Sequence, residues 1–510
     1  MKILLVYPRF PETFWSFTHA LKFINKKAAH PPLGLLTVAG LLPRDWELKL
    51  VDQNVTTLKD ADLAWADYVF VSAMAVQKEG VRDLITRCQR LERRIVAGGP
   101  LFTVSAEDYP EVDHLVLGEA ELTLPRFLAD LAAGNPRHLY TADPEEWADL
   151  STTPQPRWDL LDMKKYNAMS LQYSRGCPFD CDFCDITLLY GRRPRTKSSK
   201  QMLAELEDLF AHGWRGGVFM VDDNFIGNKE MLKQELLPAM DQWLTARGFP
   251  FTFNTQASIN MADDDKLLEA MVEVGFESVF IGIETPHEGS LTECNKLQNK
   301  NRDLLAAVKK IQRYGLQVQG GFILGFDQDP PTIFERQIEF IQQSGIVTAM
   351  VGLLNVLKGT KLYQRMEKEG RILTESVGNN TNQQINYQPM MSWEKLLAGY
   401  KRVTATLYTP KYFCRRVIAF LKEYNPPRRR KLHLRLYHLT AFAKALFWLG
   451  IWDQNRWYFW RLVGWSLLKK PRVFPLAVTY SIYGYHFRKF FLEQTVAAPV
   501  PLTAPDTSTV

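Results

Sequence analysis

Three cysteines, Cys177, Cys181 and Cys184, lie within the stretch YSRGCPFDCDFCDI and are spaced C-x3-C-x2-C. Thiols this close together could close a disulfide, hold a zinc ion or carry an iron–sulfur cluster. The chain has only six cysteines, and its start, MKILLVYPRF, lacks the long apolar region and the cleavage site of a secretory signal. We therefore expect a reducing, cytoplasmic location, where clustered cysteines bind metal more often than they form disulfides.

The choice between zinc and a cluster depends on the number of ligands. A structural zinc site uses four ligands, usually from two pairs. No second C-x2-C or H-x3-H lies near the trio, and His212 is too isolated to be a persuasive fourth ligand. Three thiolates suit a [4Fe–4S] cluster with one iron left open, and an open coordination position is typical of a catalytic metal site. The spacing therefore favours a cluster whose fourth iron binds a small molecule.

The elements expected around the cysteines form a series of strands and helices. Residues 169–177 predict a strand that ends at the first cysteine. Helical patterns separate it from five further predicted strands at 216–225, 251–258, 278–285, 317–326 and 347–357. Six such repeats predict a partial, TIM-like (β/α)6 barrel over 166–370, with catalytic groups at the carboxyl ends of its strands. The residues at those ends are Asp222, Asp223, Gln256, Glu284 and Gly325.

The first 145 residues predict a separate, Rossmann-like α/β domain. Short apolar runs at 2–8, 47–52, 68–73, 94–99 and 114–120 alternate with helical patterns at 33–42 and 78–93. Ligands bind such sheets at the carboxyl ends of the strands, but tight strand-to-helix turns explain glycine and proline there equally well. The residues at these ends are Ser72, Gly98, Gly99, Pro100, Gly118 and Glu119. A linker over 146–165, rich in proline and tryptophan, separates this domain from the barrel.

The cysteine motif, with Phe183 directly before the last cysteine, resembles the cluster motif of the radical SAM enzymes. VFMVDDNFIGN (218–228) and FIGIETP (280–286) resemble the second- and fourth-strand motifs of radical SAM enzymes that carry an N-terminal cobalamin domain. GGFILGF (320–326) resembles the fifth-strand glycine motif near the adenine. The segments HPPLGLLTVAGLLP, VSAMAVQ, VAGGP and VLGEAE of the first domain resemble the cobalamin-binding domain itself.

This resemblance implies a [4Fe–4S] cluster on the three cysteines, with S-adenosylmethionine (SAM) on its open iron as the source of a 5′-deoxyadenosyl radical. It also implies that Glu284 contacts the SAM ribose or amino group, that Asp222 or Asp223 lies close by, and that Phe183 and Gly325 belong to the cofactor site. From the residues alone, Glu284 could instead be held by a basic neighbour inside the barrel mouth, and either aspartate could be a helix cap.

In the cobalamin-binding class the corrinoid lies over the carboxyl ends of the N-terminal strands. The resemblance thus makes Ser72, Gly98, Gly99, Pro100 and Glu119 cofactor-site candidates. One departure is that the D-x-H-x-x-G motif, which supplies a histidine to cobalt in many corrinoid proteins, is absent. The lower ligand of cobalt therefore stays unassigned, because His30 before a Pro-Pro turn is more typical of an ordinary loop residue.

The region 371–491 predicts helices rich in aromatic and basic residues, and 492–510 predicts a disordered tail. The longest run without a formal charge, 473–487, has fifteen residues, whereas a spanning helix needs about 20. The aromatic and basic faces could dock on an anionic bilayer, or the helices could pack on the barrel with their basic faces merely solvated. The residues concerned are Trp448, Trp452, Trp457, Trp460, Trp465, Arg428, Arg429, Arg430, Lys431, Lys469, Lys470, Arg472, Arg488 and Lys489.

The net charge of +6 does not by itself predict nucleic-acid binding, and no recognised RNA-binding motif is present. The full-length pattern resembles a subgroup that includes the hopanoid C-2 methylases. This implies methylation of an unactivated carbon of a hopanoid-like or isoprenoid lipid through methylcobalamin, with flavodoxin or ferredoxin as electron donor. It also implies a cytoplasmic enzyme with peripheral contact at the inner face of the membrane.

Two other functions stay open at this point. The same cofactors could drive ring formation, oxidation or carbon–carbon coupling without methyl transfer. A non-catalytic corrinoid or iron sensor is disfavoured, because a sensor has no need of the GIETP and GGFILGF motifs of a SAM site. The remaining cysteines, Cys88, Cys294 and Cys414, are expected to be packing residues.

Overall fold

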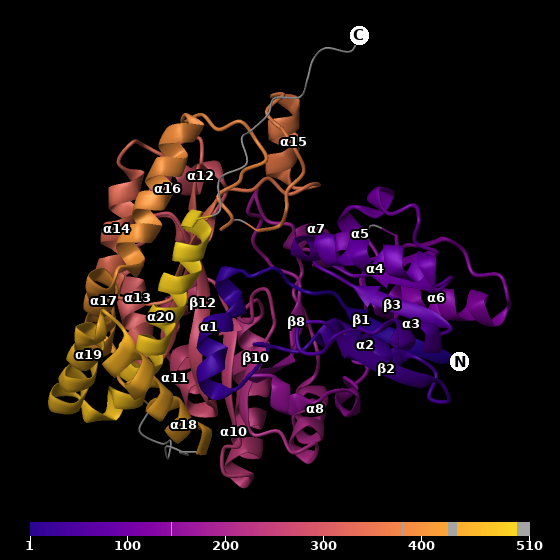
Figure 1. Ribbon diagram of the computed structural model, residues 1–510, viewed down its shortest axis with the longest axis horizontal. Coiled ribbons are helices and arrows are strands. Elements are labelled where there is room, and N and C mark those ends of the chain that lie inside the picture. The colour runs from indigo at the N-terminus through magenta and orange to yellow at the C-terminus, as the bar shows by residue number, and fades with distance from the viewer. Residues whose placement is uncertain (144, 380, 427–435, 497–510) are drawn as a thin grey trace. The chain divides into compact units, whose positions relative to one another are not determined.

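The computed structural model describes residues 1–143, 145–379, 381–426 and 436–496, with the backbone only for 436–437 and 492–496 (Figure 1). The chain divides into two compact units. The first consists of Met1–Glu12, Lys27–Pro178 and Asp185–Asp223, and the second of Thr13–Lys26, Phe179–Cys184 and the chain from Asn224 onward. The predicted basic residues Arg428–Lys431 and most of the predicted tail fall outside the described residues.

The N-terminal sheet of the first unit is entirely parallel, with strand order β2-β1-β3-β4-β5-β6. Ile3 and Leu5 of the first strand enter one apolar core, and Leu4 and Val6 enter the other, so both faces of the sheet are buried. The strands are β1 Lys2–Tyr7, β2 Glu47–Asp52, β3 Tyr68–Ser72, β4 Arg94–Gly98, β5 His114–Val116 and β6 Leu139–Tyr140. The predicted Rossmann-like sheet is confirmed.

Helices cover both faces of this sheet. α4 (Lys78–Arg90) and α5 (Pro100–Val104) pack against one core, while α2 (Leu33–Leu41) and α6 (Ala120–Ala132) pack against the other. A short helix, α3 (Asp60–Trp65), also contributes to the first core. This two-sided cover is what a parallel sheet requires, because its strands are apolar on both faces.

The first unit also contains the beginning of the second strand-and-helix series. β7 (Ala168–Leu171) and β10 (Gly216–Met220) form a parallel pair. The chain between these two strands contains β8 (Ser174–Arg175) and β9 (Arg195–Thr196), which form a separate two-stranded antiparallel sheet. It also contains the helices α7 (Ile186–Tyr190) and α8 (Ser199–Ala211).

The second unit continues the series with four parallel strands in chain order. These are β11 Phe251–Gln256, β12 Phe276–Glu284, β13 Gln317–Leu324 and β14 Ala349–Leu353. The helices of this part are α9 Lys229–Met231, α10 Leu237–Ala246, α11 Asp265–Val274, α12 Glu288–Glu293, α13 Leu304–Tyr314, α14 Ile333–Ser344 and α15 Lys361–Lys368. Asp264 and Asp303 cap α11 and α13 by accepting hydrogen bonds from the backbone N–H of Leu267 (3.0 Å) and Ala306 (2.9 Å). The predicted strand-and-helix series is confirmed.

The C-terminal part of the second unit is helical, as predicted. Its helices are α16 Trp393–Tyr408, α17 Pro410–Glu423, α18 Leu436–Ala445, a π-helical turn Leu446–Trp452, α19 Arg456–Lys469 and α20 Phe474–Val496. The last helix passes the predicted tail boundary at 491, because the next five residues include no proline or glycine that would end it. No helix within the described residues is long and apolar enough to cross a membrane.

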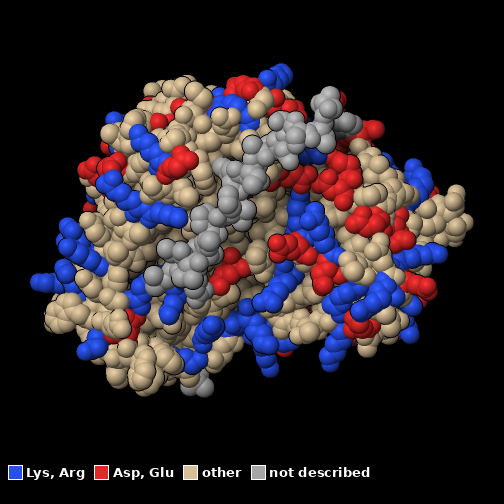
Figure 2. All heavy atoms as spheres, turned by 45° about the horizontal axis from the view of Figure 1, so that its top comes forward, with Lys and Arg blue, Asp and Glu red and all other residues tan. Residues whose placement is uncertain are grey.

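The segment Thr13–Lys26 lies with these C-terminal helices, although it comes from the other end of the chain. Figure 1 shows its helix α1 (Thr18–Leu21) beside α20. Phe14 stacks on Phe487 with ring centroids 4.4 Å apart, and Tyr408 and Phe491 surround the pair. No pattern in the sequence predicts this contact between the two ends of the chain. Lys and Arg are interspersed with Asp and Glu on the face shown in Figure 2, in keeping with the mild net charge.

Candidate functional site

The second and third cysteines of the motif lie on a short loop of the second unit, 179–184, that rests on the segment after β12. The backbone N–H of Asp182 donates to the Cys294 carbonyl (3.1 Å), and the Asp182 carbonyl accepts from the backbone N–H of Leu362 (2.9 Å). The side-chain amide of Asn295 donates to the Asp180 carbonyl (2.7 Å). These hydrogen bonds fix the loop backbone on both sides of Cys181.

All six cysteines are free thiols, and the three of the motif are partly exposed. Cys177 belongs to the first unit, whereas Cys181 and Cys184 belong to the second. Within the described residues, no three or more His, Cys, Asp or Glu side chains are grouped so that they could hold a metal ion. The chemistry of the donors, three thiols and no other ligand type, fits an iron–sulfur cluster. Ligation by these three cysteines stays a prediction.

A lysine that sequence reasoning missed lies beside this loop. The Lys296 ammonium contacts Glu284 Oε1 at 2.7 Å, and the two side chains are only 13% and 8% exposed. Burial would lower the pKa of Lys296, but the charges of Glu284 and Cys181 outweigh it and raise the pKa, so the side chain stays cationic. The ammonium also lies 5.8 Å from the centre of the Phe183 ring. From the residues alone, a basic neighbour was one of two possible partners for the Glu284 carboxylate, and Lys296 is such a neighbour.

The thiol of Cys181 is influenced by two neighbouring polar side chains. The side-chain amide of Gln298 donates to Cys181 Sγ at 3.6 Å. Burial raises the pKa of the Cys181 thiol, whereas the positive charge of Lys296 and the amide of Gln298 pull it down. Both polar groups favour the thiolate, which is the form that binds iron.

The backbone at Glu284 is strained, which explains the glycine two residues before it. Glu284 has a φ of 63°, in the left-handed region that non-glycine residues rarely adopt, and the pairing of β12 with β13 slips between Gly282 and Glu284. A Cβ on Gly282 would lie 2.3 Å from Glu284 Oε1, so only glycine leaves room for the carboxylate. Asn299 and Gln337 donate side-chain hydrogen bonds to the carbonyls of this bulge. Strain held in place in this way is typical of functional sites.

Gly325 directly follows β13, and its backbone conformation and its close neighbours both require a glycine at this position. Its φ is 110°, and a Cβ there would lie 2.8 Å from the Tyr387 hydroxyl, which donates to the Gly325 carbonyl at 2.5 Å. The Gly325 N–H donates to Asp329 Oδ2 at 2.9 Å. Burial raises the pKa of Asp329 to about 6, against the hydrogen bond from Ser290. No motif in the sequence marks Tyr387, so this contact was not predicted.

In the first unit, Asp222 and Asp223 follow β10 and have different surroundings. Asp222 is fully buried and accepts hydrogen bonds from the backbone of Tyr173 and from the backbone and hydroxyl of Ser174, three residues before Cys177. Asp223 has a buried Oδ2 with no hydrogen-bond partner among the described residues. Burial, followed by the charges of Asp222 and Asp185, raises the pKa of Asp223 to about 7. Asp222 therefore anchors the turn before the motif, whereas Asp223 has a free acceptor.

Glu119, a predicted cofactor residue, lies in a buried ion-pair network of the first unit. Its carboxylate accepts from Arg175 (2.9 Å), Arg195 (2.9 and 3.0 Å) and the backbone N–H of Ala148 (2.9 Å). Arg175 also forms a bidentate pair with Glu121, at 2.8 and 3.0 Å. Burial alone would raise the pKa of Glu121, but the hydrogen bonds and charge of Arg175 lower it to about 2. Arg175, the residue that joins the two glutamates of this network, lies two positions before Cys177 in the chain. A cofactor role for Glu119 stays a prediction.

The other cofactor candidates of the first domain do meet at the carboxyl edge of its sheet. A Cβ on Gly99 would lie 2.5 Å from the Ser72 hydroxyl, and one on Gly98 would lie 2.6 Å from the Val116 carbonyl. Gly99 has a φ of 87° and precedes α5, which begins at Pro100. The structure thus brings Ser72, Gly98 and Gly99 close together at this edge, which is compatible with both the turn and the ligand interpretations.

Two further predictions concern His30 and the three cysteines outside the motif. His30 packs on Phe219 with ring centroids 5.0 Å apart, its Nδ1 is buried without a hydrogen bond among the described residues, and burial lowers its pKa to about 4. It is therefore a neutral packing residue. The expectation that Cys88, Cys294 and Cys414 are packing residues is confirmed, because all three are buried.

Comparison with known proteins gives three matching domains. The B12 binding domain matches residues 23–128, and the Radical SAM superfamily matches residues 171–341. A domain of unknown function, DUF4070, matches residues 360–497, which include the C-terminal helices. The three matches follow the predicted order of a cobalamin domain, a radical SAM domain and a helical extension.

Full-length relatives give a consistent result. The chain is 41% identical to an uncharacterized methyltransferase of Synechocystis sp., over 96% of this chain and 92% of the relative. It is 35% identical to the hopanoid C-2 methylase of Rhodopseudomonas palustris, over 83% of this chain and 79% of the relative. The cobalamin-dependent SAM radical enzyme OxsB, solved with aqua-cobalamin bound, has the same fold, with a TM-score of 0.61 at 16% identity over 96% of this chain and 80% of that chain.

Proposed function

The chain belongs to the cobalamin-binding radical SAM family, in the group of the hopanoid C-2 methylase, and on this basis we propose that it methylates an unactivated carbon of a hopanoid-like or isoprenoid lipid. The observation that carries the proposal is the 35% identity to that methylase over 427 residues. The two cofactor domains are expected within the first 370 residues, so a match over 427 residues must also include part of the C-terminal region. Similarity in that region is not explained by shared cofactors, and we take it as support for a shared class of substrate.

In this proposal each cofactor would be held by its own set of residues. Cys177, Cys181 and Cys184 would hold a [4Fe–4S] cluster with SAM, and the edge formed by Ser72, Gly98, Gly99 and Pro100 would face cobalamin. When bound, these groups supply the radical and the methyl group of the reaction. Glycine is needed at Gly98 and Gly99 because a Cβ on either would lie within 2.6 Å of an atom of a neighbouring strand, so the two residues let the strand ends approach closely at this edge.

The chain's own residues would then bind and orient these groups. The Lys296 ammonium, held by Glu284 at 2.7 Å, places a positive charge beside Cys181 and Cys184 and stabilises their thiolates. The unpartnered oxygen of Asp223 can accept a hydrogen bond from a cationic group such as the SAM amine. Phe183 and Gly325 would line the same site. Glu284 would fix Lys296 and contact SAM with its other oxygen.

Methylation is favoured over ring formation, oxidation or coupling without methyl transfer. The two relatives described above, at 41% and 35% identity, are named as a methyltransferase and a methylase. The reaction also requires a one-electron donor, for which flavodoxin or ferredoxin is proposed. A hopanoid-like substrate resides in a bilayer, so the proposal includes a cytoplasmic enzyme with peripheral contact at the inner face of the membrane.

The test is a methyl-transfer assay with the full chain, reconstituted anaerobically with iron, sulfide and cobalamin. SAM with a deuterated methyl group, a chemical reductant and lipids extracted from a strain lacking the gene are supplied together. We expect one lipid to gain a deuterated methyl group, and the same lipid to be the methylated species missing from that strain. A product that changes without gaining label would support the alternative chemistry. Deoxyadenosine formation without any changed lipid would contradict the proposed substrate class.

A further inference from the structure

The large apolar side chains that are exposed to solvent are concentrated in one stretch of the second unit. Elsewhere they occur singly, as at Met74 and Met390. Between residues 439 and 468, nine of them occur within thirty positions, and Trp452 and Trp457 are each 72% exposed. We call this set the aromatic patch: Leu439, Phe447, Trp448, Ile451, Trp452, Trp457, Trp460, Leu467 and Leu468. Exposed apolar surface gathered in this way marks an interaction site.

The aromatic patch is made of two helical stripes with buried opposite faces. On α19, Trp457, Trp460, Leu467 and Leu468 follow one another at helical spacing, and Phe459, Leu462, Val463 and Ser466 on the other side are buried. On α18 and the following π-helical turn, the second stripe is formed by Leu439, Phe447, Trp448, Ile451 and Trp452, while Ala441, Ala445 and Leu449 are buried. Each helix therefore packs with one face and leaves an apolar face without a partner among the described residues.

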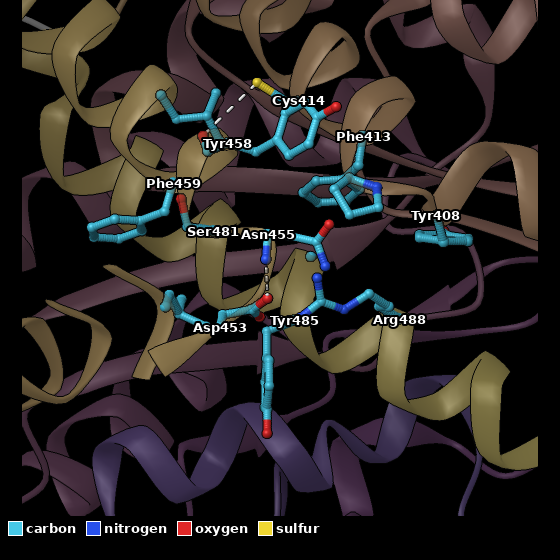
Figure 3. Close-up of a pocket in the computed structure, with 14 residues that line it drawn as sticks. Tyr408, Phe413, Cys414, Asp453, Asn455, Tyr458, Phe459, Ser481, Tyr485 and Arg488 are labelled. Carbon is cyan, nitrogen blue, oxygen red and sulfur yellow. Dashed lines mark hydrogen bonds and ion pairs between the residues drawn. The ribbon is translucent and has the colours of Figure 1, made fainter. Parts of the chain in front are cut away.

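The two stripes meet at a turn that the fold holds rigidly. The Trp460 indole N–H donates to the Gly450 carbonyl at 2.9 Å, which joins α19 to the π-helical turn. Asp453 accepts from the backbone N–H of Asn455 (2.7 Å) and forms an ion pair with Arg488 of α20, as Figure 3 shows at the wall of a pocket. The Asp453 N–H donates to the Trp448 carbonyl (2.9 Å). These contacts fix both stripes against the body of the second unit.

The stretch that carries the aromatic patch has a large excess of positive charge. Residues 438–491 contain eight Lys and Arg but a single acidic residue, Asp453, which Arg488 already neutralises. Arg456, Arg461, Lys469 and Arg472 are exposed and have no acidic partner among the described residues. Tryptophan beside uncompensated cations is the composition of a surface that binds at the interface of an anionic bilayer.

We propose that the aromatic patch docks α18 and α19 flat on an anionic lipid bilayer, with the tryptophans among the headgroups and the four cations against lipid phosphates. The inference deepens the proposed function and rests on it only for the lipid nature of the substrate. A second copy of this chain fits less well, because two such patches face to face would bring the same unpaired cations together. Docking places the second unit at the surface where a lipid substrate resides.

The test is co-sedimentation of the full-length protein with vesicles of phosphatidylcholine and phosphatidylglycerol, and with vesicles of phosphatidylcholine alone. We expect binding to the anionic vesicles that weakens at high salt. The double variant Trp452→Glu/Trp457→Glu should bind more than about tenfold more weakly, because two large apolar side chains are lost from the interface. Lys469→Gln and Arg472→Gln should each weaken binding about fivefold.

Met390→Glu is the matched control, because Met390 is a 71% exposed apolar residue outside the aromatic patch. It should bind vesicles like the unchanged protein, and circular dichroism with thermal unfolding should show that all variants are folded. Equal loss of binding in Met390→Glu, or full binding by the tryptophan variant, would overturn the proposal. Equally tight binding to both vesicle types would overturn the role of the cations. A tryptophan-dependent dimer in sedimentation velocity, without vesicle binding, would replace the bilayer by a second copy.

The same variants separate this proposal from the proposed function. If both are right, the tryptophan variant methylates lipid poorly in vesicles but at the normal rate in detergent. If the protein binds vesicles through the aromatic patch and methylates no lipid under either condition, the substrate assignment fails and the docking surface stands. If methylation in vesicles is unaffected by the tryptophan variant, the docking surface fails and the substrate assignment stands.

Discussion

Two buried charge clusters, one in each unit, differ in ways that separate stability from chemistry. In the first unit, the carboxylates of Glu119 and Glu121 are surrounded by two arginines and ordinary backbone. In the second, Glu284 has one cation, Lys296, a left-handed backbone and thiols as neighbours. In the first cluster every carboxylate has several hydrogen-bond partners, an arrangement that holds elements of the fold together. A residue with a strained backbone and a single charged partner, such as Glu284, is typical of a functional site. We therefore expect the first cluster to govern folding and the second to govern activity.

The largest effect is expected at the thiols beside Lys296. Cys181→Ala should bring bound iron and deoxyadenosine formation down to background, because the cluster loses a ligand. The matched control is Cys294→Ala, since Cys294 is buried nearby and its Sγ has only a weak contact with the Leu291 carbonyl, at 3.7 Å. Iron content by absorbance and deoxyadenosine by chromatography provide the two measurements. Normal iron and turnover in Cys181→Ala would contradict the assignment of the site.

The next effect is on folding and comes from the first cluster. Arg175→Met leaves the buried carboxylates of Glu119 and Glu121 without their shared partner, so the free energy of unfolding should fall by about 3–5 kcal/mol. Urea unfolding measures the change. Arg126→Met is the control, because Arg126 and Glu146 form an exposed pair that should contribute less than about 1 kcal/mol. If both variants lose the same stability, the first cluster has no special role in folding.

The pH dependence of stability should report on Glu121. Its pKa is about 2 in the folded chain and 4.5 ordinarily, so its contribution is fully present above pH 4.5 and is lost as the pH falls toward 2. The size of this contribution is about 3 kcal/mol. Urea unfolding across this range should show a shallower acid-induced loss for Glu121→Gln than for the unchanged protein. Parallel curves for the two proteins would show that Arg175 does not lower this pKa.

The smallest effect separates charge from packing in the second cluster. Lys296→Met alone leaves Glu284 without a partner and should destabilise, whereas the double variant Lys296→Met/Glu284→Gln removes both charges and should regain most of the stability. Deoxyadenosine formation should nevertheless stay about tenfold slower in the double variant, equivalent to about 1.4 kcal/mol of barrier, because the thiolates lose a neighbouring cation and SAM loses the carboxylate of Glu284. Activity that recovers together with stability would show that the pair is only structural.

The sequence predicted the features that depend on local pattern. Each apolar run that was expected to form a strand contains one, but the strand expected over 169–177 ends at Leu171, and the short strand β8 of a separate sheet follows it before the cysteine motif. Lys296, Gln298 and Tyr387 were missed because each meets its partner only through the fold. Gln298 is 117 positions from Cys181, and Tyr387 is 62 positions from Gly325. Glu119 was predicted from its place after a strand, but nothing local shows that two distant arginines surround it.

The packing of Phe14 against Phe487 has a consequence for how the protein is made. The segment Thr13–Lys26 leaves the ribosome early, yet its stacking partner in α20 is translated last. At typical rates of synthesis the early segment waits for roughly 25–95 s with its aromatic side chains uncovered. During that interval it is a natural substrate for chaperones. A ribosome that stalls before α20 would release a chain whose first helix has no place to pack, and quality-control proteases could recognise the unfinished protein by that helix.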